Sequence, residues 1–78
     1  MDIKGQVKEF FIDNFMAEMD SVTDSDSFLE NGIIDSTGVL ELVLFLEEKY
    51  NIKVEDDEII PENLDSLENI ASYVMSKN

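Results

Sequence analysis

The sequence contains no cysteine, no histidine and no tryptophan. These absences exclude disulfide bonds, cysteine and histidine metal ligands, thiol nucleophiles and a serine–histidine–aspartate triad. Any general acid or base would have to be a carboxylate, a lysine or a tyrosine. A self-contained hydrolase is therefore not expected. An enzyme built on carboxylates is a distant alternative, because the sequence indicates no concave site for one, and we predict that the chain is not an enzyme.

Positive charge is scarce: 5 lysine and arginine residues stand against 19 aspartate and glutamate residues, for a formal net charge of −14. Such a chain repels the phosphates of nucleic acids and the headgroups of anionic membranes, so neither is an expected partner. A basic protein surface is the natural partner, since long-range attraction speeds the encounter. The alternative reading of the charge is that it serves solubility alone.

Long hydrophobic runs are also absent, and none approaches the roughly 20 residues of a membrane span. The first residues, MDIKGQVKEFF, alternate acid and base and do not resemble a signal peptide. We expect a cytoplasmic, monomeric protein. Its 78 residues fit one domain over 1–78 with a thin core, and the hydrophobic content of 44% favours a folded chain.

Apolar residues at helical spacing predict an all-α fold, a small four-helix bundle. The main helices are expected over residues 3–19, about 36–50 and about 66–76, and Pro61 fits the first turn of a short third helix in the acidic segment 56–64. Asn51 is the expected end of the second helix. The apolar faces consist of Ile3, Val7, Phe10, Phe11 and Phe15; Val39, Leu42, Val43, Leu46 and Tyr50; and Leu67, Ile70, Ala71 and Val74.

A long first loop connects the first two predicted helices. Its apolar residues should tuck it onto the core, because a connection this long rarely lies loose in a small domain; they are Phe28, Leu29, Ile33 and Ile34. Its serines, by contrast, are expected to be solvated; they are Ser21, Ser25 and Ser27. The acidic loop fits no calcium-binding EF-hand register, since Leu29 and Ser25 occupy the required glycine position, so no metal site is predicted.

The dipeptide Asp-Ser occurs five times, and two copies open predicted helices. In Asp65-Ser66-Leu67-Glu68 the spacing is that of a capping box, with Asp65 as the expected cap, which explains Ser66 structurally. In Asp35-Ser36-Thr37-Gly38 the capping-box position holds glycine, which costs about 1 kcal/mol against alanine in a helix. Ser36 is placed at the positive end of a helix dipole, where a phosphate ester is favoured.

The second predicted helix is too hydrophobic for a single buried stripe. Leu40 and Leu44 fall outside its core face by angle, and Phe45 lies near Glu41 and Glu48. Exposed apolar groups beside acids indicate a docking surface for a protein partner. For Phe45 the alternative is that the short third helix or the long loop covers it. A plain acidic adaptor, which uses this helix to bind a basic groove, is the rival interpretation of the whole chain.

Several runs resemble the acyl carrier protein family. They are Gly32–Ser36 (Gly-Ile-Ile-Asp-Ser), Val39–Val43, Leu46–Tyr50 and the tail Ile59–Ile70. The resemblance covers essentially the whole chain. It implies a non-catalytic carrier that holds acyl groups as thioesters for partner enzymes of fatty acid, polyketide or nonribosomal peptide biosynthesis.

By this resemblance Ser36 is the serine to which a transferase attaches 4′-phosphopantetheine from coenzyme A, and Asp35 completes the motif and caps the helix. The arm would supply the thiol that a cysteine-free chain lacks. Thr37 replaces the usual leucine and Gly38 a polar or acidic residue, which implies specialised partners, such as an acyl-activating ligase, over a general fatty-acid synthase. The expected docking residues are Thr37, Leu40, Glu41, Leu44, Glu47 and Glu48.

Overall fold

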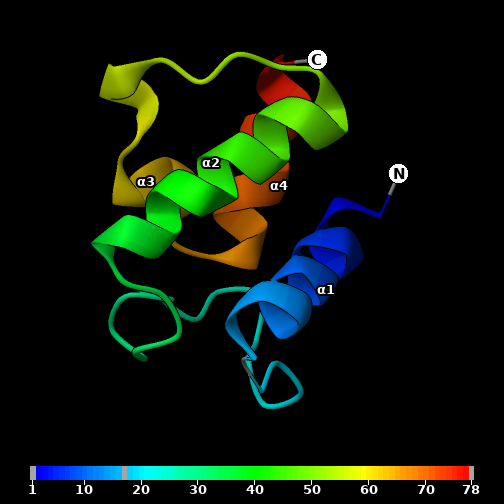
Figure 1. Cartoon of the computed structure of the whole chain (residues 1–78), viewed down its shortest axis with the longest axis vertical. Coiled ribbons are helices and arrows are strands. Elements are labelled where there is room, and N and C mark those ends of the chain that lie inside the picture. The colour runs from blue at the N-terminus through cyan, green and yellow to red at the C-terminus, as the bar shows by residue number, and fades with distance from the viewer. Residues whose placement is uncertain (1, 17, 78) are drawn as a thin grey trace.

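The computed structural model describes residues 2–16 and 18–77, and its elements are all helical in this part of the chain. Three long helices are present, α1 (Ile3–Phe15), α2 (Ser36–Tyr50) and α4 (Leu67–Lys77). A 3-10 turn, η1 (Asp56–Glu58), and a short helix, α3 (Pro61–Leu64), connect α2 to α4 (Figure 1). The predicted all-α fold of three main helices, a short third helix and a long first loop is confirmed.

The core is formed by all four α-helices together with the long loop. Phe28, from the loop, is fully buried and meets the buried Phe11 of α1 edge-on, with ring centroids 4.7 Å apart. The other fully buried large side chains are Leu42, Leu46, Leu67, Ile70, Val7 and Val74. The loop therefore contributes to the core as the helices do, which explains why a connection of this length can be held in one place.

Helices α1 and α2 lie side by side in opposite directions (Figure 1). Near the start of α1 and the end of α2, the Tyr50 hydroxyl donates to Gln6 Oε1 at 2.5 Å. One to two turns further along, the rings of Phe10 and Phe45 stack with centroids 4.4 Å apart. Phe45 is thus half-buried, with its ring stacked on a ring of α1.

The first helix ends earlier than the spacing predicts, so the expected extent of 3–19 is wrong. Met16 adopts a left-handed conformation with φ of 54°, and its N–H bonds to the Phe11 carbonyl. Residue 17 lies outside the described residues. Met19 is buried after the chain has turned, so its apolar character reflects the core and not a continued helix. The expected end of α2 at Asn51 is confirmed by the same left-handed geometry.

The long loop is tied to the corner between α3 and α4 through Asp65. The Leu29 N–H donates to Asp65 Oδ1 at 3.0 Å, the Phe28 N–H donates to the Asp65 carbonyl at 2.9 Å, and the Ser27 hydroxyl donates to Asp65 Oδ2. The expectation that Ser27 is solvated is therefore wrong. Phe28 and Ile34 are buried as predicted, whereas Leu29 is exposed over 44% of its surface.

The start of α4 also differs from its predicted form. Ser66 is buried, and its Oγ accepts from the N–H of Asn69 at 3.1 Å, so Ser66 and not Asp65 supplies the capping oxygen. Both side-chain oxygens of Asp65 already bind the long loop. The capping-box spacing predicted the start of the helix correctly, but the capping oxygen belongs to Ser66 and not to Asp65.

Candidate functional site

Ser36 is the first residue of α2 and is exposed to solvent. The preceding residue, Asp35, is extended and caps the helix, because its Oδ1 accepts from the N–H of Gly38 at 2.7 Å. The capping role predicted for Asp35 is confirmed. Ser36 therefore presents its hydroxyl at the amino end of a 15-residue helix, where the aligned peptide dipoles favour a negatively charged substituent.

Gly38 is buried one half-turn after Ser36, against the end of α1 and the last residues of the loop. A Cβ at this position would lie 2.6 Å from Ile34 Cγ1 and 3.3 Å from Phe15 Cε1. Close packing at this position thus favours glycine, despite its low helix propensity. The first turn of α2, which carries Ser36, therefore packs against Ile34 with no room for a side chain between them.

An apolar groove of about 230 Å³ lies beside Ser36. Its walls come from three places: the first turns of α2, the long loop, and the segment that leads into α3. The lining residues are Leu29, Ile34, Ser36, Val39, Leu40, Ile59, Ile60, Pro61, Leu64 and Asp65. Sequence reasoning did not identify this groove. Its signal in the sequence is a set of apolar residues outside the long helices, Leu29, Ile59 and Ile60.

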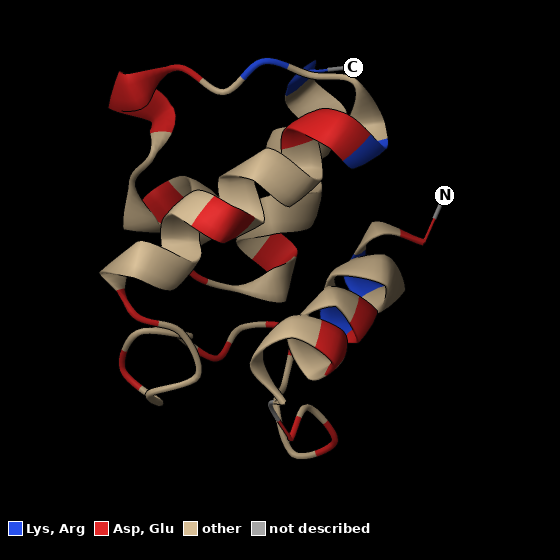
Figure 2. Cartoon of the chain, in the orientation of Figure 1, with Lys and Arg blue, Asp and Glu red and all other residues tan. Residues whose placement is uncertain are grey.

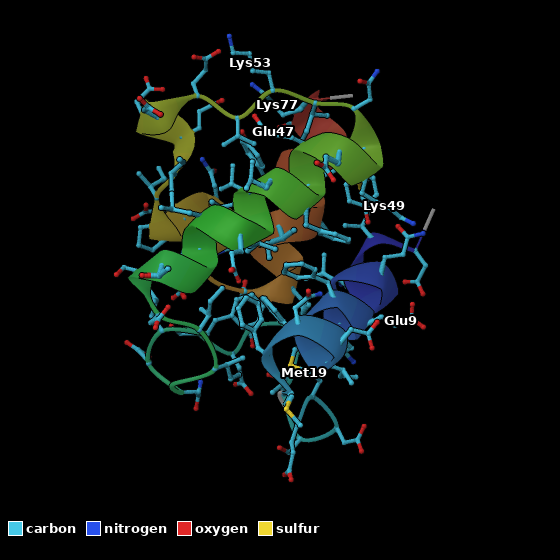
Figure 3. The ribbon with its side chains drawn as sticks, viewed as in Figure 1. Glu9, Met19, Glu47, Lys49, Lys53 and Lys77 are labelled. Atoms are coloured by element: carbon cyan, nitrogen blue, oxygen red, sulfur yellow. The ribbon has the colours of Figure 1, made fainter. Side chains whose placement is uncertain are left out.

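The residues expected to dock partners lie along α2. Leu40 and Leu44 are exposed over 56% and 59% of their surfaces, as their angle on the helix predicted. Thr37, Glu41 and Glu48 are exposed as well. Glu47 differs from them, because it is half-buried and its Oε2 accepts from the N–H of Val54 at 3.0 Å. Figure 3 shows Glu47 near the end of α2, where this bond holds the segment that follows.

Positive charge is concentrated away from Ser36. No lysine or arginine occurs between residues 9 and 48. Figure 2 shows the basic residues on the first turns of α1, at the far end of α2 and near the C-terminus. Three of the lysines form salt bridges, Lys4 with Asp24, Lys53 with Glu55 and Lys77 with Glu58. All charged residues between positions 9 and 48 are therefore acidic, and their field attracts basic protein surfaces.

A polar cluster holds η1 against the end of α4 and so positions the segment before α3. Glu58 Oε1 accepts from Lys77 Nζ at 2.9 Å and from the Tyr73 hydroxyl at 3.1 Å. The hydrogen bond from Lys77 and that from the Glu55 N–H lower the pKa of Glu58. Burial, with the bond to Glu58, raises the pKa of Tyr73 to about 12.

The described residues contain neither a metal site nor a membrane-spanning helix. No group of three or more acidic side chains there is arranged to hold a metal ion. None of the described helices combines the length and the apolar character that a bilayer crossing requires.

Comparison with known proteins gives one family match, which spans residues 5–74 and is described as "Phosphopantetheine attachment site". The acyl carrier protein of Lactobacillus acidophilus is 29% identical over 75 residues, which cover 96% of this chain and 91% of the relative. The acyl carrier protein of Bdellovibrio bacteriovorus is 29% identical over 99% of this chain and 96% of its own. The D-alanyl carrier protein of Streptococcus sanguinis is 39% identical over 54 residues, covering 69% of this chain and 67% of its own.

Proposed function

This chain belongs to the phosphopantetheine-attachment family of acyl carrier proteins, and on that premise we propose that Ser36 is its attachment serine. The function of an acyl carrier and the prosthetic group 4′-phosphopantetheine follow from the family. The choice of serine rests on one observation above the others. Ser36 combines an exposed hydroxyl with the amino end of a long helix and a bordering apolar groove.

The residues around Ser36 fit such a group. Its hydroxyl is exposed, so a transferase can reach it, and the helix dipole stabilises the phosphodiester that results. Asp35, which would otherwise repel the phosphate, directs Oδ1 to the N–H of Gly38. No lysine or arginine of residues 9–48 is present to neutralise the phosphate, so the backbone amides of the first helical turn are the donors at hand.

The attachment reaction is a phosphoryl-type transfer from coenzyme A. A bond forms between Ser36 Oγ and the phosphorus of the pantetheine phosphate, the pyrophosphate bond of coenzyme A breaks with release of adenosine 3′,5′-bisphosphate, and the hydroxyl proton passes to the transferase. When bound, the arm supplies a thiol that holds an acyl group as a thioester. The chain itself anchors and orients this arm, because the packing of Gly38 against Ile34 fixes the first turn of α2.

The partners proposed for the carrier are a phosphopantetheinyl transferase and an acyl-activating ligase or synthase with a basic docking patch. The proposed docking surface lies on α2 and consists of Thr37, Leu40, Glu41, Leu44, Glu47 and Glu48. The exposed leucines provide apolar area, and the acidic residues provide steering. Cytoplasmic location and a monomeric state remain predictions from the sequence.

Mass spectrometry tests the attachment serine directly. Incubation of the apo protein with coenzyme A, magnesium and a broad-specificity transferase should add one phosphopantetheinyl group. Ser36→Ala should abolish the addition. Ser25→Ala is the matched control, because it alters an exposed serine of another Asp-Ser pair, and it should leave the addition intact. Modification that persists in a folded Ser36→Ala protein contradicts the assignment.

A further inference from the structure

We propose that the docking surface continues from α2 across a second groove onto α1, and that this groove receives an arginine side chain of a partner protein. This inference rests on the proposed carrier function, because that function is the reason for treating α2 as a docking surface. It adds a helix, α1, that neither the motif around Ser36 nor the angular pattern of α2 brings into play.

The second groove lies between the antiparallel helices α1 and α2 and has a volume of about 650 Å³. Phe10 and Phe45, which stack at 4.4 Å with an interplanar angle of 19°, are both half-buried and form its apolar part. The exposed Leu44 flanks them. The full lining is Gln6, Glu9, Phe10, Asp13, Asn14, Glu41, Leu44, Phe45, Glu48 and Lys49.

Four carboxylates surround this apolar part, two from each helix. Glu9 and Asp13 come from α1, and Glu41 and Glu48 come from α2, and all four are exposed. No salt bridge within the described part of the chain engages any of the four. The groove has a single lysine, Lys49, which Figure 3 places at the end of α2, while Glu9 is labelled on α1. The formal charge of the lining is therefore strongly negative.

The combination of apolar floor and acidic rim selects the chemistry of the occupant. An arginine side chain can lay its aliphatic part on Leu44 while its planar guanidinium stacks on a phenylalanine ring. The same guanidinium reaches carboxylates on both sides in a forked geometry that a lysine ammonium cannot reproduce. A second copy of this chain is a poor occupant, because its net charge of −14 repels the first.

The groove is also continuous with the surface already proposed for partners. Glu41, Leu44 and Glu48 line this groove and also belong to the docking surface proposed on α2. None of the three lines the apolar groove beside Ser36. A partner that holds α2 from this side leaves the apolar groove next to Ser36 uncovered. This arrangement suits an enzyme that must grip the carrier while the serine at the end of α2 stays accessible.

The test uses the apo protein labelled with ¹⁵N and a defined probe. The probe is a helical peptide with two arginines one turn apart and a leucine between them; the control peptides replace both arginines by neutral citrulline or by lysine. At low salt, the arginine peptide should shift the amide signals of residues 6–14 and 41–49. The citrulline peptide should not shift them, and the lysine peptide should bind at least about twofold more weakly, because its ammonium cannot stack.

The variants separate α1 from α2. Glu9→Gln with Asp13→Asn should weaken binding of the arginine peptide roughly three- to tenfold, the effect of losing two exposed ion pairs. Asp56→Asn with Asp57→Asn removes the same charge from exposed positions in η1, outside the groove, and should change affinity by less than about twofold. Equal weakening by the two double variants would show that only overall charge matters and would overturn the proposal.

Two other results bear on it differently. If the arginine peptide shifts only the amide signals of α2, and the double variant on α1 does not change its affinity, then α1 takes no part in binding. The loading of Ser36 is not affected by that result. Equal affinity of the arginine and lysine peptides overturns the choice of arginine. Failure of Ser36 to accept phosphopantetheine would instead refute the attachment site, and the peptide titration would be unaffected, so the two failures are distinguishable.

Discussion

Replacement of Gly38 by alanine tests the packing that orients Ser36. On helical propensity alone the change should stabilise α2 by about 1 kcal/mol. The new Cβ, however, would stand 2.6 Å from Ile34 Cγ1, about 1 Å inside a favourable carbon–carbon contact. Ile34 is buried and branched at Cβ, so Cγ1 moves only when the side chain changes rotamer or the loop shifts. Overpacking of this kind costs about 1–3 kcal/mol, and we expect a net destabilisation of roughly 1 kcal/mol.

Chemical denaturation followed by circular dichroism measures this effect, and a double-mutant cycle isolates its cause. Ile34→Ala removes the atom that the new methyl group meets. In that background Gly38→Ala should become neutral or stabilising, with a coupling of about 1–2 kcal/mol. Ser72→Ala, at an exposed position in α4, is the control for propensity and should stabilise by a few tenths of a kcal/mol.

The rate at which transferase loads Ser36 should fall in Gly38→Ala, because the first turn of α2 must shift to admit the methyl group. Recovery of that rate in the double variant would tie the loss to the contact with Ile34. The reasoning is refuted if Gly38→Ala alone stabilises the protein by about 1 kcal/mol, since the helix would then have room for a side chain.

Three further predictions concern the surface and the charges. Leu44→Ala should change stability by less than about 0.5 kcal/mol yet slow loading, whereas Leu46→Ala should cost about 2–5 kcal/mol in denaturation; equal losses would place Leu44 in the core. Added salt or millimolar magnesium should raise the thermal midpoint of unfolding, because it screens the net charge of −14. A midpoint that does not change with ionic strength would show that the charges are already balanced locally. The pKa of Tyr73, about 12 and so above its ordinary 10.0, gives stability that is present below pH 10 and lost between pH 10 and 12. Burial also raises the pKa of Tyr50, so the phenolate absorbance titration of Tyr73→Phe should lose the phenolate that forms near pH 12 and keep that of Tyr50; an unchanged titration would assign the step elsewhere.

Much of the fold was predictable because apolar periodicity reports burial directly. The positions expected on the core face of α2, such as Leu42 and Leu46, are buried, and Leu40 and Leu44 are exposed. The end of α1 was not predictable in this way. Met19 has the right spacing for a continued helix, but it reaches the core after a left-handed residue at Met16, and no local residue preference marks that turn.

The site was predictable in part. The position of Ser36 at a helix start and its cap by Asp35 followed from local spacing. The roles of Gly38 and Asp65 did not, because each depends on how the folded chain places other side chains, including Ile34, which would meet a Cβ on Gly38 most closely. Gly38 meets Phe15, and Asp65 binds Ser27 and the backbone of the loop, so only the folded chain brings their partners together.

The bonds of Asp65 have a mechanical consequence for the apolar groove beside Ser36. The loop and the segment that leads into α3 form two of its three walls, and Asp65, which follows α3, ties the loop to the end of that segment and so joins the two into a single frame. No hydrogen bond in the described part of the chain joins α2, the third wall, to α3 or to the loop before Asp35. The position of α2 against this frame is set by close packing, since the first turn of α2 meets Ile34 at Gly38. An enzyme that grips α2 therefore holds a wall of the groove that packing, and not hydrogen bonding, keeps in place.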